Sequence, residues 1–164
     1  MLEGFDEGEA EELQQKVIPI TKVLVKLCKV TFKTINLSTL LLLQWYAILA
    51  EHNKKETIMT RDKKVINIFT SNNTDNGLQE FALNRAEWKM AEQLHEVLSI
   101  LKDATVFFSC STPNLVMVIP SMDYINSKFE KMIANVELDP AIHTTMSLAK
   151  MTLNKYYAKT SDVY

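Results

Sequence analysis

The residues whose spacing carries the clearest chemistry are four lysines in the first third of the chain. Lys22, Lys26, Lys29 and Lys33 stand at offsets of 0, 4, 7 and 11, so in an α-helix all four share one side. That side lies opposite the apolar stripe of the same helix. A positive ridge of this kind can follow the phosphates of DNA, with an affinity that falls as salt rises. The alternative is the solvated face of an ordinary amphipathic helix, and the pattern leaves both readings open.

A second group of cations follows in a polar stretch. It comprises Lys54, Lys55, Arg61, Lys63 and Lys64. We expect this stretch to be a loop, and binding residues are common on loops. Contact with DNA and plain solubility are the two interpretations. DNA is therefore the candidate partner of both basic groups.

The residue types that perform catalysis do not form a recognised pattern. The sequence has no P-loop, dinucleotide-binding glycine motif, zinc-protease motif or hydrolase motif. His52, His95 and His143 share no short spacing. Asp103 and Asp123 fall on different predicted helices, and a pair of carboxylates could hold two metal ions. Asp103 fits better as an acid near a helix end, and Asp123 fits better as an exposed residue. We expect no catalytic residue, no metal and no cofactor.

The two tryptophans are candidate interface residues. Trp45 and Trp88 each lie within a predicted helix, where a large apolar ring packs in a core or against another helix. Ligand stacking is the less favoured alternative.

Composition places the 164-residue chain among soluble globular proteins, with 47% hydrophobic and 23% charged residues. Only 3 Gly and 4 Pro occur, which favours long helices. The net charge of −2 gives no overall attraction to nucleic acid. Cys28 and Cys110 are far apart, as expected for packed thiols in a reduced, intracellular protein. The acidic start and the short leucine run predict neither a leader peptide nor a membrane span.

The first half of the chain is expected to hold two helices and a long loop. Residues 1–12 are acidic and predicted to be flexible, and residues 13–53 form a helical pair. Pro19 should kink the first helix or mark its beginning. A basic and polar loop is expected over 54–82, where 65–69 is either a short strand or a helical turn. The stripe of the first helix comprises Leu13, Val17, Ile20, Leu24 and Leu27.

Residues 83–164 read as three helices with their own start signals. Asn84 and Glu87 form a capping box, and Thr112-Pro113 and Asp139-Pro140 each pair an N-cap with a proline at the first helical position. The fold prediction is therefore mostly α, an irregular bundle of about five helices. The apolar stripes of the three helices comprise Leu94, Val97, Leu98 and Leu101, then Val118, Met122, Ile125, Phe129 and Met132, then Ile142, Met146, Ala149, Leu153 and Tyr156.

The order of several marks over 83–157 closely resembles the helical part of hAT-superfamily DNA transposases. These marks are Glu87-Trp88, Lys102-Asp103-Ala104-Thr105, Thr112-Pro113-Asn114, Val118-Ile119-Pro120 and Leu153-Asn154-Lys155-Tyr156-Tyr157. The resemblance implies a helical domain of the kind that hAT transposases insert into an RNase H-like core, before the last of three metal-binding acids.

The resemblance also implies what this chain does not contain. None of the family's three catalytic acids matches a residue here, and Thr60-Arg61 is followed by Asp62 where the family has a tryptophan-centred TRWNST segment. We therefore expect a truncated, inactive transposase-derived protein that supports DNA handling and assembly in the nucleus. The alternative is a non-enzymatic helical module that binds a protein partner or a second copy. Neither hypothesis involves a membrane or a small-molecule substrate.

Overall fold

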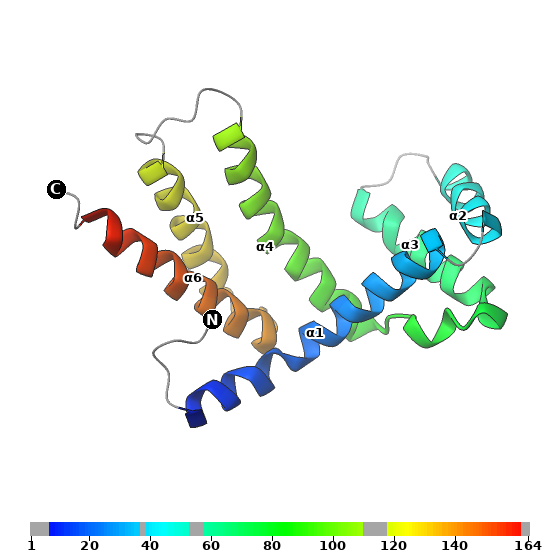
Figure 1. The fold of residues 1–164 in the computed structure, drawn as a ribbon, viewed down its shortest axis with the longest axis horizontal. Helices are drawn as coiled ribbons and strands as arrows, with labels where there is room; N and C mark the ends of the chain where they lie inside the picture. Colours follow the sequence, from blue (N-terminus) through cyan, green and yellow to red (C-terminus); the bar gives the residue numbers. More distant parts are fainter. Residues whose placement is uncertain (1–6, 37–38, 53–57, 110–117, 162–164) are drawn as a thin grey trace. The chain divides into compact units, whose positions relative to one another are not determined.

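The computed structural model describes residues 7–36, 39–52, 58–109 and 118–161, and within these ranges every regular element is helical (Figure 1). The mostly α prediction is confirmed, with six α-helices and two short 3-10 helices in the described ranges. The elements are α1 (Glu7–Asn36), α2 (Thr39–Glu51), α3 (Ile58–Asn72), η1 (Thr74–Asn76), η2 (Gln79–Phe81), α4 (Arg85–Ser109), α5 (Val118–Ile133) and α6 (Pro140–Ser161).

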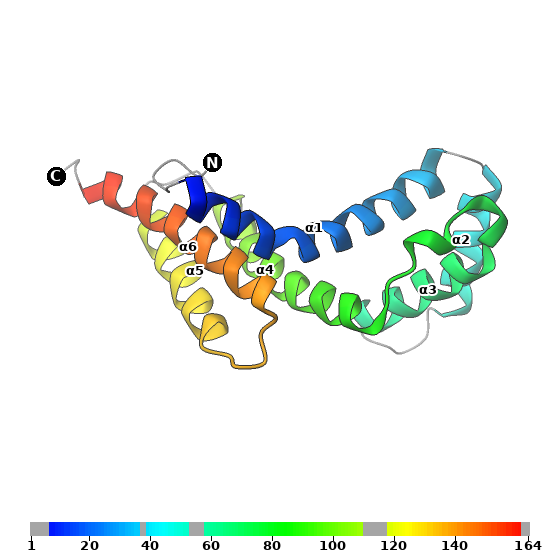
Figure 2. The same cartoon turned by 90° about the horizontal axis from the view of Figure 1, so that it is seen from below.

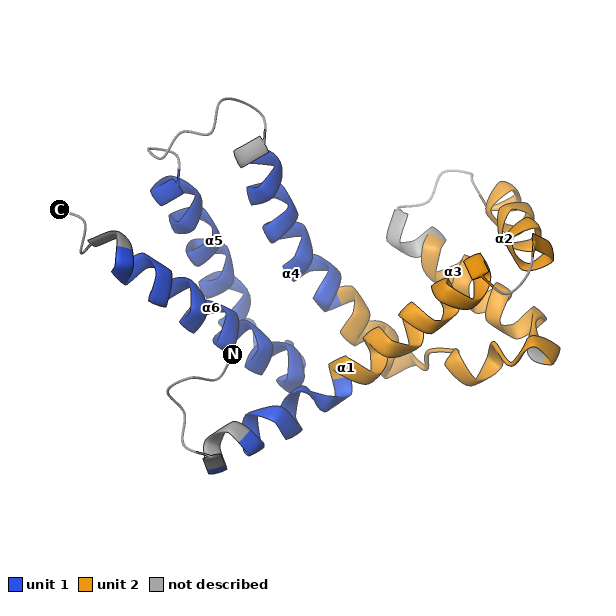
Figure 3. Cartoon of the chain, viewed as in Figure 1, with its two compact units in different colours: residues 1–19, 93–164 blue, residues 20–92 orange. Residues whose placement is uncertain are grey.

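The chain divides into two compact units (Figure 3). Unit 1 comprises residues 1–19 and 93–164, and unit 2 comprises residues 20–92. Helices α1 and α4 therefore each contribute one part to unit 1 and the other part to unit 2. The division within α1 falls directly after Pro19, which has no N–H for the helical hydrogen bond. Helix α1 begins at Glu7, so Pro19 does not mark its beginning, and the expected flexible segment 1–12 is helical from residue 7.

Unit 2 is organised around the inner face of α2. Leu41 is buried with Phe69 of α3, and the Trp45 ring meets Phe69 edge to face at 5.3 Å between centroids. Edge-to-face pairing adds to the stabilisation that burial of the two rings already provides. The same core includes Val30, Leu78 and Phe81, with Ile48 packed against it.

The loop predicted over 54–82 is wrong for residues 58–72, which form α3, and so is the alternative of a strand near 65–69. Val65 and Phe69 are four residues apart and both fully buried, so the short apolar patch is one face of a helix. The polar residues before it supply the exposed turns. The Thr70 hydroxyl and the Asn73 amide donate to carbonyls one turn back, which satisfies two buried polar side chains.

In unit 1 the buried apolar side chains lie on α4, α5 and α6. Helices α5 and α6 lie side by side in both views (Figures 1 and 2). The stripe predicted for α5 is confirmed, since Met122, Ile125 and Phe129 are buried. In α6 only the first half of the stripe is buried, at Ile142 and Met146.

The stripe predicted for α4 is wrong at two positions. Val97 is buried, but Leu98 and Leu101 are exposed, and Ile100 and Ala104 are buried in their place. The buried face of α4 is therefore rotated about the helix axis, by about one residue position, from the predicted buried face. Sequence periodicity could not distinguish the two, because apolar residues occupy both sides of this helix.

The helix starts follow the capping signals where they are described. The Ala141 N–H donates to the Asp139 carboxylate at 2.9 Å, and Pro140 is the first residue of α6. The Gln93 side chain binds the loop that precedes α6. It accepts a hydrogen bond from the Asp139 N–H at 2.9 Å and donates one to the Glu137 carbonyl at 3.0 Å. The predicted Thr112-Pro113 cap lies outside the described residues.

Candidate functional site

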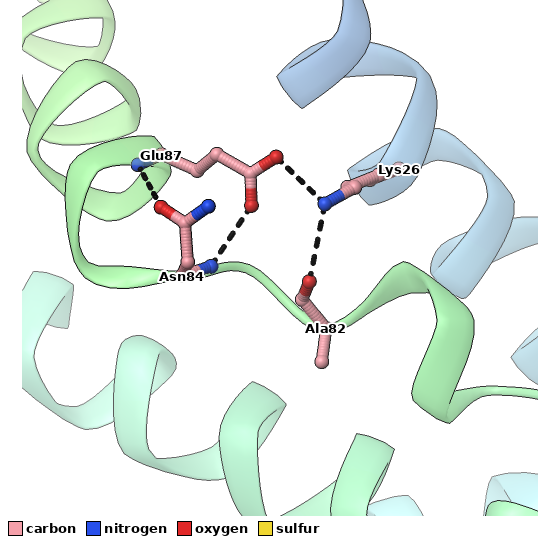
Figure 4. A network of polar contacts seen from close by, with 4 residues as sticks. All are labelled: Lys26, Ala82, Asn84 and Glu87. Atoms are coloured by element: carbon pink, nitrogen blue, oxygen red, sulfur yellow. Dashed lines mark hydrogen bonds and ion pairs between the residues drawn. The ribbon is translucent and has the colours of Figure 1, made fainter.

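The four ridge lysines lie along α1 in unit 2, and two of them reach acidic residues. Lys26 Nζ lies 2.6 Å from Glu87 Oε1 and donates to the Ala82 carbonyl at 3.3 Å (Figure 4). Lys33 donates to the Gly77 carbonyl at 3.1 Å and lies 3.4 Å from a Glu80 carboxylate oxygen. Both cations bind the segment that leads into α4. Because their charges are partly neutralised by Glu87 and Glu80, they attract a phosphate less strongly.

Lys29 and Lys33 also lie over an aromatic ring. Their ammonium groups are 5.3 and 4.6 Å from the centroid of Phe81 in η2, within the range of a cation–π interaction. Lys22 and Lys29 are both exposed. Among the described residues, no carboxylate forms an ion pair with either of these two lysines.

The lysines border the buried face of α1 instead of lying opposite it. The stripe predicted from Leu13 to Leu27 continues only in part in unit 2, where Ile20 is buried but Leu24 is exposed. The other buried residues of α1 lie outside the predicted stripe, at Val23, Val30 and Thr34. This buried face is turned toward the lysine side of the helix. Long lysine side chains can therefore run along the covered surface and place their charged ends on the neighbouring segment.

The second basic cluster is only partly described. Lys63 of α3 pairs with Glu92 of α4 at 2.8 Å, and its ammonium lies 5.6 Å from the centroid of the Trp88 ring. Lys64 is exposed on α3. Arg61 belongs to α3, but its side chain lies outside the described part, as do Lys54 and Lys55. The structure thus places Lys63 in a contact within unit 2 and does not gather the whole cluster.

Glu87 joins the start of α4 to the ridge. The Asn84 N–H donates to Glu87 Oε2 at 2.8 Å and the Glu87 N–H donates to Asn84 Oδ1 at 2.9 Å, which confirms the predicted capping box (Figure 4). Partial burial alone would raise the pKa of Glu87. The Lys26 hydrogen bond, the Asn84 N–H and the charge of Lys26 outweigh that effect, so the pKa lies below its usual value.

Both tryptophans pack within unit 2. Trp88 is only 4% exposed, and its indole Nε1 donates to Asn67 Oδ1 at 2.9 Å. Trp45 is half-buried against Phe69. Packing within unit 2 therefore accounts for the positions of both rings. Little of the Trp88 ring is accessible to a partner.

Carboxylates and histidines do not assemble into a metal site in the described part of the chain. No group of three or more His, Cys, Asp or Glu side chains that could hold a metal ion occurs there. Asp103 and Asp123 are both exposed, and Asp123 accepts a hydrogen bond from the Tyr157 hydroxyl at 2.6 Å. This bond raises the pKa of Tyr157, as do desolvation and the charge of Asp123 to a smaller extent. The arrangement is a helix-to-helix contact between α5 and α6.

A hollow of 380 Å³ occurs in unit 1 beside α4 and α5. Its walls are mostly apolar, and Asp103 supplies the one acidic group among the residues that line it. This lone exposed carboxylate has no second acid beside it among the lining residues to act with. The lining residues are Asp103, Ala104, Phe107, Pro120, Ser121 and Tyr124.

The feature with the strongest functional indication is apolar surface on unit 2. Phe32 and Ile35 are exposed near the end of α1, and α2 exposes Leu40, Leu43 and Tyr46. Exposed apolar patches on soluble proteins often mark interaction sites. The sequence carried a signal for this surface, because α2 has no charged residue before Glu51 and has leucines on both sides.

Comparisons of the chain with family models, with curated proteins and with solved structures find no match. Helices in the described ranges are too short or too polar for any of them to cross a lipid bilayer.

Proposed function

We propose that this chain corresponds to the helical insertion of an hAT-type transposase and acts in DNA handling and assembly, without a chemical step of its own. The resemblance over 83–157 supports the proposal, and two residues within that range cap helices. Glu87 closes the capping box of α4, and Asp139 caps α6 ahead of the late Leu153 to Tyr157 mark. The observation that carries the assembly role is the exposed apolar side of α2.

The absence of a chemical step can be tested directly. Supercoiled plasmid is incubated with the chain in the presence of Mg²⁺ or Mn²⁺, and nicking is followed on agarose gels. We expect no turnover. Metal-dependent nicking that disappears in the Asp103→Asn or Asp123→Asn variant would contradict the proposal, since these are the two acids that could act as a pair.

The DNA-handling part depends on Lys22 and Lys29, because the other two ridge lysines are paired with acids. Neutralising two phosphates gives a slope of about −2 in a plot of log affinity against log salt, whereas four lysines would give about −4. Fluorescence anisotropy with labelled duplex DNA measures this slope. Loss of binding in Lys22→Ala/Lys29→Ala is expected, and Lys102→Ala, an exposed lysine on α4, serves as the control.

A second candidate function is a protein-interaction module that has no role on DNA. The exposed apolar residues of α1 and α2 favour it, because they can bind another chain without any charge. Gel filtration at low and high salt separates the two functions. Association that is unchanged by salt, together with no DNA binding, would favour the interaction module, and salt-sensitive DNA binding would favour the transposase-type function.

A further inference from the structure

Helix α2 has a complete apolar outer face. Its inner face packs through Leu41 and Trp45 onto the unit 2 core. On the outer side Leu40 is 60% exposed, Leu43 65% and Tyr46 59%. Ala47 and Ala50 are exposed too, and no charged residue occurs from Thr39 to Ala50. An exposed helix on a globular protein ordinarily carries charge on its outer face, so this face requires another explanation.

The spacing of the outer residues is that of a helix-pairing seam. Leu40, Leu43, Ala47 and Ala50 are separated by steps of 3, 4 and 3 residues, the alternation by which two α-helices pack along a shared stripe. The large side chains occupy the first half of the seam and the small ones occupy the second half. We refer to these four residues as the α2 seam.

We propose that the α2 seam pairs with the α2 seam of a second copy of this chain, in antiparallel orientation about a two-fold axis. In that arrangement Leu40 faces Ala50 of the other copy, and Leu43 faces Ala47 of the other copy. Each large side chain then meets a small one, so the seam is self-complementary in size, as a two-fold contact requires. A parallel pair would place leucine on leucine at one end and alanine on alanine at the other.

The inference deepens the assembly role and rests on it. DNA is a poor occupant because the seam offers no cation to a phosphate. From their exposed fractions, Leu40, Leu43 and Tyr46 present on the order of 350 Å² per copy, or about 700 Å² in a pair, against about 1,200–2,000 Å² for stable complexes. The expected dimer is therefore weak and dissociates on dilution.

Sedimentation velocity of the full chain from about 1 to about 500 µM tests the pairing. We expect a shift from monomer to dimer that salt does not change. Leu43→Glu and Ala47→Glu should each remove the dimer, because they place two charges in the centre of the contact. Leu98→Glu is the matched control, since Leu98 is a half-exposed leucine on α4. Circular dichroism verifies that each variant keeps its helical content.

Three results would overturn the proposal. The first is a wild-type chain that stays monomeric at the highest concentration, in which case the seam belongs to a different partner. The second is a dimer that both seam variants retain, and the third is a loss of dimer in Leu98→Glu as well. None of these outcomes affects the DNA-binding test on Lys22 and Lys29, so a failure of the seam and a failure of the transposase-type function are distinguishable.

Orientation is tested by disulfide trapping. Leu40→Cys and Ala50→Cys chains of different size tags are made in a Cys28→Ser/Cys110→Ser background, mixed and oxidised. Antiparallel pairing predicts mainly mixed disulfides between the two tagged chains. A product dominated by like-with-like disulfides would show a parallel seam and refute the proposed geometry.

Discussion

Glu87 performs two tasks in unit 2, and a single substitution separates them. Glu87→Gln keeps a side-chain oxygen for the Asn84 N–H but removes the charge that holds Lys26. A hydrogen bond to a charged group contributes about 1.5–3 kcal/mol. The Glu87 and Lys26 side chains are 19% and 28% exposed, so solvent screening reduces that value to about 1–2 kcal/mol. We expect Glu87→Gln to lower the free energy of unfolding by this amount at pH 7.

The same interaction sets a dependence on pH. The folded pKa of Glu87 lies below its ordinary 4.5, so the folded state binds the proton less tightly than the unfolded state does. The stabilisation is therefore present above the unfolded pKa and is lost as the pH falls through the folded pKa. The difference in stability between wild type and Glu87→Gln should be full at pH 7 and should shrink as the pH falls below 4.5.

Urea unfolding followed by tryptophan fluorescence is a suitable assay. The chain has 2 tryptophans, Trp45 and Trp88, and both lie in unit 2, so the signal reports the unit that contains Glu87. Glu51→Gln, at an exposed position of α2 in the same unit, is the control. Equal stabilities of the two variants at pH 7 would refute the reasoning, as would a deficit of Glu87→Gln that stays constant down to pH 3.

Three further substitutions test other contacts. Asp139→Ala removes the cap of α6 and should cost about 1 kcal/mol in thermal unfolding followed by circular dichroism, and an unchanged melting curve would contradict this role. Trp88→Phe leaves the half-buried Asn67 Oδ1 without its indole donor and should cost about 1–3 kcal/mol in urea unfolding. An unchanged urea midpoint would show that the amide has found another partner. Ultraviolet titration should find Tyr157 ionising above its ordinary pKa of 10.0, and Asp123→Asn should lower that value.

Local signals predicted the described helix starts well. The capping box of α4 and the Asp139-Pro140 start of α6 depend on residues at most three positions apart, so the sequence contains all that is needed. Helix α3 escaped prediction because only Val65 and Phe69 mark its fully buried side, too few for a period to be read with assurance.

Contacts between residues far apart in the sequence explain why the covered side of α1 was not predicted. The acid that pairs with Lys26 is 61 residues away along the chain, and the one that pairs with Lys33 is 47 residues away. Those acids, together with Phe81 and Leu78, determine which side of α1 is covered. No window of α1 alone contains that information, so its lysines read as a free ridge when two of them are ion-paired within unit 2.

Unit 1 is discontinuous in sequence, and this has a consequence for synthesis. Its first segment, up to residue 19, leaves the ribosome before the whole of unit 2, while its remaining partners begin at residue 93. At about 5–20 residues per second, translation of the intervening stretch takes roughly 4 to 15 seconds. During that delay the early segment lacks the unit 1 partners that residues 93–164 supply.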